Sequence, residues 1–162
     1  MKNLLLVLVA SFLLGACGKS GSGSGPSPAN VGVLDLTDRA ECAGVTPPGL
    51  TLGSASWMLI QKAPNGIGYR RIYRFHPRSM EVIVTARSDA HMEHLRVRSR
   101  VRYQPGGIAI MSRAHRAKLI HSAQGPVPFE FSLMPTVATY SFVGSCLQLN
   151  LGGESMVLVP NR

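Results

Sequence analysis

Strict alternation of apolar and charged residues is the sequence feature that most constrains the fold. In the segment 95–103, Leu, Val, Ser, Val and Tyr occupy every second position, and four arginines stand between them. Successive side chains of a β-strand point to opposite faces, so this pattern predicts a strand with one face in the core. Residues two apart on a strand lie about 6.6 Å apart, so Arg96, Arg98, Arg100 and Arg102 are expected to form a row of guanidinium groups on the other face.

Period-two patterns interrupted by turn residues recur along most of the chain. Strands are expected at 57–60, 69–75, 80–87, 108–111, 117–122, 129–134, 139–142, 146–151 and 155–159. In the second of these, Tyr69, Arg71, Tyr73 and Phe75 alternate with Arg70, Ile72 and Arg74. Residues 112–118 could instead form one helical turn, and the glycine and prolines of 124–128 indicate a loop.

About eight to ten short strands with regular turns and no long helix predict an all-β fold. We expect a closed antiparallel up-and-down barrel of about eight strands, with a β-sandwich as the alternative. A closed barrel leaves no exposed strand edge on which an arginine- and valine-rich sheet could aggregate.

The final strands resemble those of small bacterial lipoproteins with a lipocalin-like barrel. The matching pieces are the segments 140–144 and 147–149, the turn Gly152-Gly153, and the apolar run that ends at Arg162. The resemblance spans about residues 50–162, although 112–128 have no counterpart, and it implies an eight-stranded barrel with an apolar cavity. The expected cavity residues are Trp57, Leu59, Tyr73, Val82, Val84, Val97 and Phe142.

The first thirty residues carry a different signal. Lys2 precedes an apolar stretch, Leu4 to Leu14, that is too short to span a bilayer as a helix. The run Leu14-Gly15-Ala16-Cys17 resembles the lipobox of bacterial lipoproteins. That resemblance implies that residues 1–16 are a signal peptide and that Cys17 carries fatty-acyl chains such as palmitate. The alternative is an ordinary secretory signal in which Cys17 is a chance residue.

A tether and one domain follow the expected lipidation site. Residues 17–30 are rich in Gly, Ser and Pro and predict a flexible spacer, and residues 31–162 are long enough for a single domain with its own core. The location implied is the cell envelope. Gly18 after the cysteine favours the outer membrane, facing the periplasm.

The state of the three cysteines depends on whether Cys17 is acylated. If Cys17 is acylated, Cys42 and Cys146 remain, and an oxidising envelope favours a disulfide between them. Free thiols or a metal site are the alternatives, although the chain contains no Cys-x-x-Cys motif.

The net charge and the sequence motifs limit the classes of function that we expect for this chain. The net charge is +9, so anionic envelope polymers or acidic lipids are expected partners, and the location argues against nucleic acid. Five histidines show no convincing zinc-ligand spacing, no Gly-x-Ser-x-Gly or phosphate-binding loop occurs, and no carboxylate pair suggests a glycosidase. We therefore expect no enzyme, no metal and no cofactor.

Two functional hypotheses remain from the sequence. The first is a lipid-anchored binding protein whose barrel takes up a small apolar or amphipathic ligand. The alternative is an envelope scaffold or interaction module that docks acidic partners through the row of four arginines. A weaker third idea is an inhibitory loop at 125–128.

Overall fold

The structure, a computed structural model, describes residues 34–161. The expected signal peptide 1–16, the lipidation site Cys17 and the tether 17–30 lie outside the described residues.

The described part of the chain consists of short strands with two 3₁₀ turns. The strands are β1 (Leu34–Asp35), β2 (Ser56–Lys62), β3 (Gly68–His76), β4 (Ser79–Arg87), β5 (Met92–Gln104), β6 (Gly107–Ile110), β7 (Ala114–Ser122), β8 (Gly125–Leu133), β9 (Thr136–Val143), β10 (Cys146–Leu151) and β11 (Glu154–Asn161). The 3₁₀ turns are η2 (Ala40–Cys42) and η3 (Leu52–Ser54).

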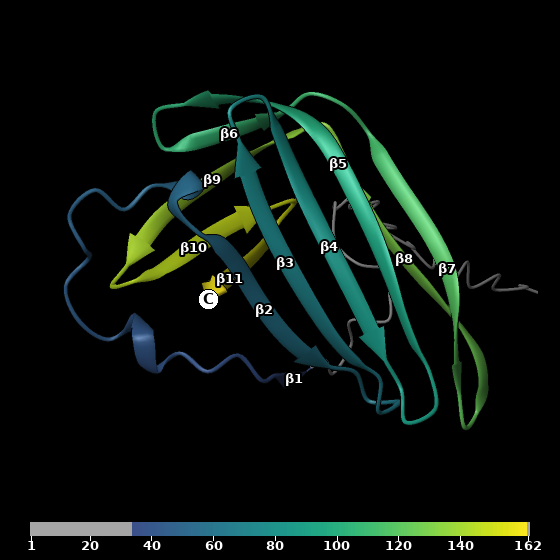
Figure 1. The fold of residues 1–162 in the computed structure, drawn as a ribbon. Coiled ribbons are helices and arrows are strands. Elements are labelled where there is room, and N and C mark those ends of the chain that lie inside the picture. The colour runs from purple at the N-terminus through teal and green to yellow at the C-terminus, as the bar shows by residue number, and fades with distance from the viewer. Residues whose placement is uncertain (1–33, 162) are drawn as a thin grey trace, which may run out of the picture.

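Eight of these strands form a closed antiparallel barrel (Figure 1). Their order around the barrel is β2-β11-β10-β9-β6-β5-β4-β3, and the pairing of β2 with β3 closes the ring. The predicted all-β barrel is confirmed, and the β-sandwich alternative is wrong. β1 is an additional short strand that pairs with β2 beyond the end of β11, with Leu34 opposite Lys62.

The hairpin between β6 and β9 is much longer than its neighbours and bends out of the barrel. β6 pairs with β9 up to Ile110 opposite Thr136, and β7 then pairs with β8 from Ala114 opposite Leu133. Three residues on one side therefore face two on the other, which is the count of a β-bulge, and Pro135 sits at this bend. Beyond it, β7 and β8 form a separate two-stranded sheet that runs beside β5 (Figure 1). We call residues 114–133 the arm.

Two local expectations are wrong in the arm. Residues 112–118 make no helical turn, because β7 occupies 114–122, and 124–128 is not a loop, because β8 begins at Gly125. Pro126 and Pro128 are compatible with a strand here because β8 is paired only with β7 and has a free edge.

The alternation in β5 has the predicted orientation. Leu95, Val97, Ser99 and Val101 are buried, while the four arginines between and after them are exposed. The inward-facing residues of β5 thus contribute to the barrel interior, and its four arginines lie on the outside.

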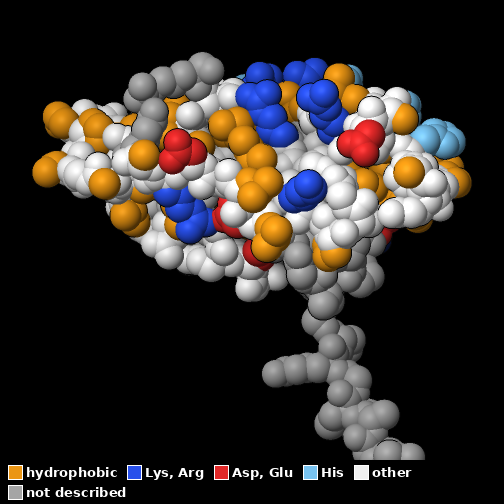
Figure 2. All heavy atoms as spheres, turned by 90° about the horizontal axis from the view of Figure 1, so that it is seen from below, with side chains coloured by type: hydrophobic (Ala, Val, Ile, Leu, Met, Phe, Trp, Pro, Cys, Tyr) orange, Lys and Arg blue, Asp and Glu red, His pale blue; other side chains and the backbone are white. Residues whose placement is uncertain are grey.

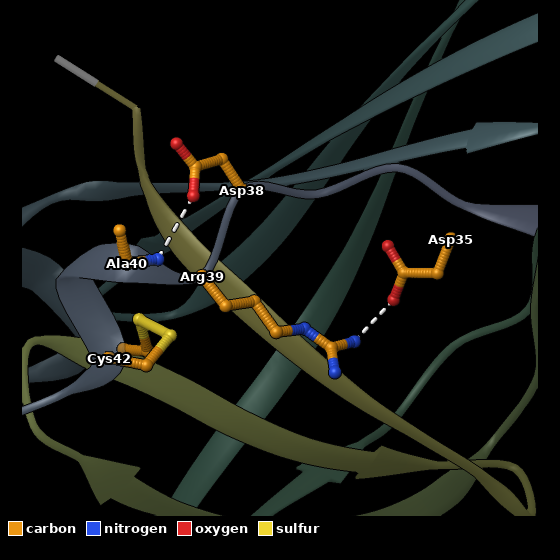
Figure 3. The surroundings of a disulfide bond; sticks show 6 residues. Asp35, Asp38, Arg39, Ala40 and Cys42 are labelled. Carbon is orange, nitrogen blue, oxygen red and sulfur yellow. Dashed lines mark hydrogen bonds and ion pairs between the residues drawn. A yellow bond between two sulfur atoms is a disulfide. The ribbon is translucent and has the colours of Figure 1, made fainter.

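A strap formed by residues 34–55 crosses the outside and covers one end of the barrel. Its disulfide joins Cys42 to Cys146, whose Cα atoms are 5.0 Å apart, which confirms the predicted bridge. Gly144 approaches the Cys42 carbonyl so closely at φ +56° that a Cβ at this position would overlap it. Near the bridge, Arg39 pairs with Asp35, and Asp38 accepts a hydrogen bond from the Ala40 amide (Figure 3).

The strap ends in a plug at the barrel opening. Leu52 of η3 is buried, and its carbonyl accepts a 2.9 Å hydrogen bond from the indole of Trp57. The strap is therefore held by the pairing of β1 with β2, by the disulfide and by the indole.

We predict that replacing both bridge cysteines, Cys42→Ala with Cys146→Ala, lowers the free energy of unfolding by about 2–5 kcal/mol. The bridge spans 104 residues, and loop closure of this length restricts the unfolded chain strongly. Urea unfolding followed by the fluorescence of Trp57 measures the change. Wild-type protein in reductant should unfold at the same urea concentration as the variant; a midpoint unaffected by reductant would contradict the prediction.

Candidate functional site

The residues expected to line a cavity all belong to the inward side of the barrel wall. Trp57, Leu59, Tyr73, Val82, Val84 and Val97 are at most 2% exposed and pack in one hydrophobic cluster. Phe142 is half-buried and packs against that cluster, with its ring centre 5.7 Å from the ring of Trp57. These side chains therefore form part of the apolar filling of the barrel, and Leu59 and Val84 lie directly opposite Arg71 in the ladders of β3.

Arg71 is the exception to the apolar interior. It occupies the inward phase of β3 together with Tyr69, Tyr73 and Phe75, and only 3% of its surface is exposed. Burying a guanidinium is costly unless its charge and its N–H groups find partners. Its surroundings therefore identify what this part of the barrel is built to hold.

The partners of Arg71 within residues 34–161 are few. Its Nη1 lies 3.5 Å from Oε1 of Glu154, whose side chain is 28% exposed, and the guanidinium also lies close enough to the Tyr73 hydroxyl to lower the pKa of that group. Its guanidinium carbon lies 5.9 Å from the centre of the Phe131 ring, within cation–π range. A guanidinium has five N–H donors, so one long contact leaves most of this capacity unused by the described side chains.

Tyr73 adds a second under-used polar group next to Arg71. Its ring is fully buried, and its hydroxyl has no hydrogen-bond partner among the described residues. Burial raises the pKa of Tyr73, and the nearby charge of Arg71 only partly opposes this effect. The hydroxyl is therefore protonated at ordinary pH and can donate a hydrogen bond into the interior.

The arm covers this polar site from the opposite side of the barrel. β8 continues into β9, which stands four places from β3 around the ring. Yet Phe129 of β8 lies 6.0 Å from Tyr69, and Phe131 lies over Arg71. The inner side chains of the arm thus reach across the interior and close the site around Arg71.

Side chains, not a β-ladder, attach the arm to β5 and its neighbours. Lys118 pairs with Glu93 at 2.5 Å, and the Ser88 hydroxyl donates a 2.6 Å hydrogen bond to the carbonyl of His121. The bond from Lys118 is the main reason why the pKa of Glu93 is lowered. Because no ladder hydrogen bonds cross this contact, separation of the arm from β5 would break no β-ladder, but it would expose Phe129, Phe131 and Leu133, which are buried in the core.

The four predicted arginines of β5 all lie on the outer surface, but they differ in their surroundings. Arg96 is neutralised by Glu81, with Nε 2.8 Å from Oε1, and Glu81 also contacts Arg74 at 3.5 Å. Arg98 donates to the Ser79 hydroxyl at 3.1 Å, whereas Arg100 and Arg102 have no side-chain partner in the described region. Seen from below, the Lys and Arg side chains gather mainly along one side of the molecule (Figure 2).

The described residues form neither a metal site nor a membrane-spanning helix. Between residues 34 and 161, no three His, Cys, Asp or Glu side chains are grouped as metal ligands would be. The same residues contain no helix of the length and hydropathy that crossing a bilayer requires. His91 and His121 stack edge to face, with their ring centres 5.4 Å apart, where the arm meets the loop before β5.

Sequence reasoning missed Arg71 and Phe131 as site residues. Arg71 is assigned no role from the sequence, although its phase in 69–75 is that of three aromatic residues. This phase was the signal that its side chain points inward. Phe131 lay in a predicted strand, but nothing in the sequence placed that strand opposite β3.

We predict that Glu154→Gln lowers the free energy of unfolding by about 1–3 kcal/mol, because it removes the carboxylate that pairs with the buried guanidinium of Arg71. Arg71→Met should cost less, since it removes the buried charge itself and leaves Glu154 partly in water. Urea unfolding curves of the two variants give the comparison. Equal stability of Glu154→Gln and wild type would show that the guanidinium does not depend on Glu154.

No family model, curated protein or solved structure matches this chain. The closed eight-stranded antiparallel barrel is itself compatible with a lipocalin-like fold.

Proposed function

We propose that the protein is a lipid-anchored binding protein of the cell envelope whose barrel holds a small amphipathic ligand with an acidic end. The observation that carries this proposal is the buried guanidinium of Arg71, which has one long hydrogen bond to a described side chain. A ligand carboxylate or phosphate would supply the missing acceptors and the missing negative charge.

The geometry around Arg71 suits such a ligand. The Tyr73 hydroxyl offers a second donor on the same face of β3, and aromatic rings from the arm offer apolar surface beside the charged group. Ligand sites of this class are mostly apolar, with a few placed polar groups that fix the orientation. The acidic end would bind at Arg71 and the apolar part would lie among the surrounding side chains.

The arm provides a route for entry. It contacts β5 through side chains and its own two strands pair only with each other. Separation of the arm would expose Arg71 without breaking any ladder of the closed barrel. We propose that ligand entry and release use this movement.

The anchor is a separate part of the proposal and rests on the lipobox resemblance of Leu14-Gly15-Ala16-Cys17. Acylation of Cys17, with palmitate among the chains, would fix the protein to a membrane, and the outer membrane facing the periplasm is the proposed location. Several acyl chains together hold a protein firmly, since each buried methylene contributes about 0.8 kcal/mol.

The anchor predicts a specific mass. Protein isolated from membranes of its native host should begin at Cys17 and carry the added mass of its acyl chains, and Cys17→Ser should abolish both the processing and the membrane association. Intact-mass spectrometry of the two proteins is the measurement. A native protein that begins at Met1 without added mass would exclude the anchor.

The ligand site predicts binding of anionic amphiphiles. An ω-bromoundecanoate should quench the fluorescence of Trp57, the only tryptophan, and Arg71→Met should weaken this binding about 10- to 100-fold. Charge-assisted hydrogen bonds contribute about 1.5–3 kcal/mol, which corresponds to that range. Fluorescence titration below the micellar concentration of the acid is the measurement.

Two controls sharpen this test. The neutral ω-bromoundecanol should bind wild type more weakly than the acid does and should be insensitive to Arg71→Met. Arg102→Gln removes one exposed arginine of the outer face and should leave the acid's affinity unchanged. Equal binding of the acid to wild type and to Arg71→Met would overturn the proposed role of Arg71.

A further inference from the structure

A hollow lies on the outside of the barrel, separate from the interior site around Arg71. Its volume is about 660 Å³, and it is lined by three arginines and three serines: Arg78, Ser79, Arg98, Ser99, Arg100 and Ser112. We call it the arginine hollow. Its lining shares no residue with the interior site around Arg71.

The hollow lies where the pairing of β5 with β4 ends and its pairing with β6 begins. β4 begins at Ser79, opposite Arg100, so β5 continues beyond the end of β4. On its other edge, β6 ends at Ile110 and the chain turns away through Ser112 into the arm. The departure of both neighbours leaves a depression beside residues 98–100.

Backbone hydrogen bonds hold the rim of the hollow. The amide of Val101 donates to the carbonyl of Arg78 at 3.1 Å, and the amide of Met111 donates to the carbonyl of Arg100 at 2.8 Å. The turn that carries Arg78 and the segment that leads to Ser112 are therefore both tied to β5. The three guanidinium groups start from a rigid frame.

Two of the serines are buried, Ser112 is half-buried, and all three are hydrogen-bonded in a defined arrangement. Ser79 is 8% exposed and Ser99 is 2% exposed. The Ser79 hydroxyl accepts from Nε of Arg98 at 3.1 Å, which orients that guanidinium and leaves the hydroxyl proton free to donate. The Ser99 hydroxyl donates to the Ser112 carbonyl at 2.6 Å, and the Ser112 hydroxyl accepts from the Arg100 amide at 3.1 Å.

The charges of the hollow are not compensated by the described residues. Glu81 lies opposite Arg98 in the ladder between β4 and β5, but its carboxylate is engaged by Arg74 and Arg96. Between residues 34 and 161, no carboxylate lies within ion-pair distance of Arg78, Arg98 or Arg100. Three positive charges thus share one depression, and a bound anion would relieve their mutual repulsion.

We propose that the arginine hollow binds a phosphate group. Guanidinium forks match phosphate oxygens in pairs, and arginines from a turn and from a strand approach an anion from different directions. A tetrahedral phosphate offers acceptors in several directions, whereas a single carboxylate offers them in one plane. The phosphate is a monoester or inorganic phosphate if the source is a free compound, and a diester if the source is a lipid headgroup.

The test titrates the full chain with three soluble probes: inorganic phosphate, glycerol 3-phosphate and the diester glycerophosphoglycerol. Calorimetry at physiological salt gives the affinities. We expect saturable binding of at least one probe, and a loss of 10-fold or more in the double variant Arg98→Gln/Arg100→Gln. Tighter binding of the monoester or of inorganic phosphate would identify a free phosphate compound, and equal or tighter binding of the diester would identify a headgroup.

The matched control is Arg87→Gln/Arg102→Gln. It removes the same charge from exposed positions of β4 and β5 that do not line the hollow, and its affinities should stay within about 2-fold of wild type. Ser79→Ala keeps every charge and should weaken binding several-fold, so it tests the site even if the double arginine variant does not fold. The proposal is overturned if no probe binds wild type, or if the control loses as much affinity as the Arg98/Arg100 pair.

Discussion

The burial of one guanidinium in a closed β-barrel is the constraint around which the lower half of this molecule is organised. Arg71 points inward because its phase on β3 is that of Tyr69 and Tyr73, and the pairing of β3 with both β2 and β4 fixes that phase. A slip of one residue in either ladder would expose the aromatic residues and bury Arg70 and Arg74 instead. The barrel therefore holds the cation in place, and Glu154 and Phe131 only partly offset its desolvation.

The arm is the second consequence of that arrangement. An eight-stranded barrel has an interior just wide enough to be filled by side chains, and here Phe129 and Phe131 fill the part that faces β3. The bulge before β7 lets these rings swing inward, at the expense of the ladder to β5. A wall segment held by side chains in front of a buried charge is a suitable place for controlled access.

The two faces of β5 separate the two proposed sites. Leu95, Val97 and Val101 belong to the core, whereas on the outward face Arg96 pairs with Glu81, and Arg98 and Arg100 line the arginine hollow. The proposed interior site around Arg71 of β3 and the proposed outer site beside β5 therefore share no residue.

Much of the fold could be predicted from local pattern, because period-two alternation reports directly which side of a strand faces the core. The arginines of 95–103 and the disulfide between Cys42 and Cys146 followed from phase and from counting. The arm did not follow, since Pro126 and Pro128 indicate a loop and only the free edge of β8 makes them acceptable in a strand. The two sites were harder to predict than the fold. Arg78 and Ser112 lie near Arg98 only because β4 ends and the chain bends after β6. Phe131 contacts Arg71 only because the barrel closes. Such contacts depend on register and closure, which a pattern within one segment does not contain.

The proposed function requires that N–H donors of the Arg71 guanidinium remain free to bind an anionic ligand. Nitrogen-15 NMR of the arginine side chains measures this directly, with the Nε–Hε signal of Arg71 assigned by its disappearance in Arg71→Lys. On addition of dodecanoate, the account predicts that this signal shifts more than any other arginine signal and that the shift saturates. An Arg71 signal that stays in place while dodecanoate reaches saturating concentration would contradict the account.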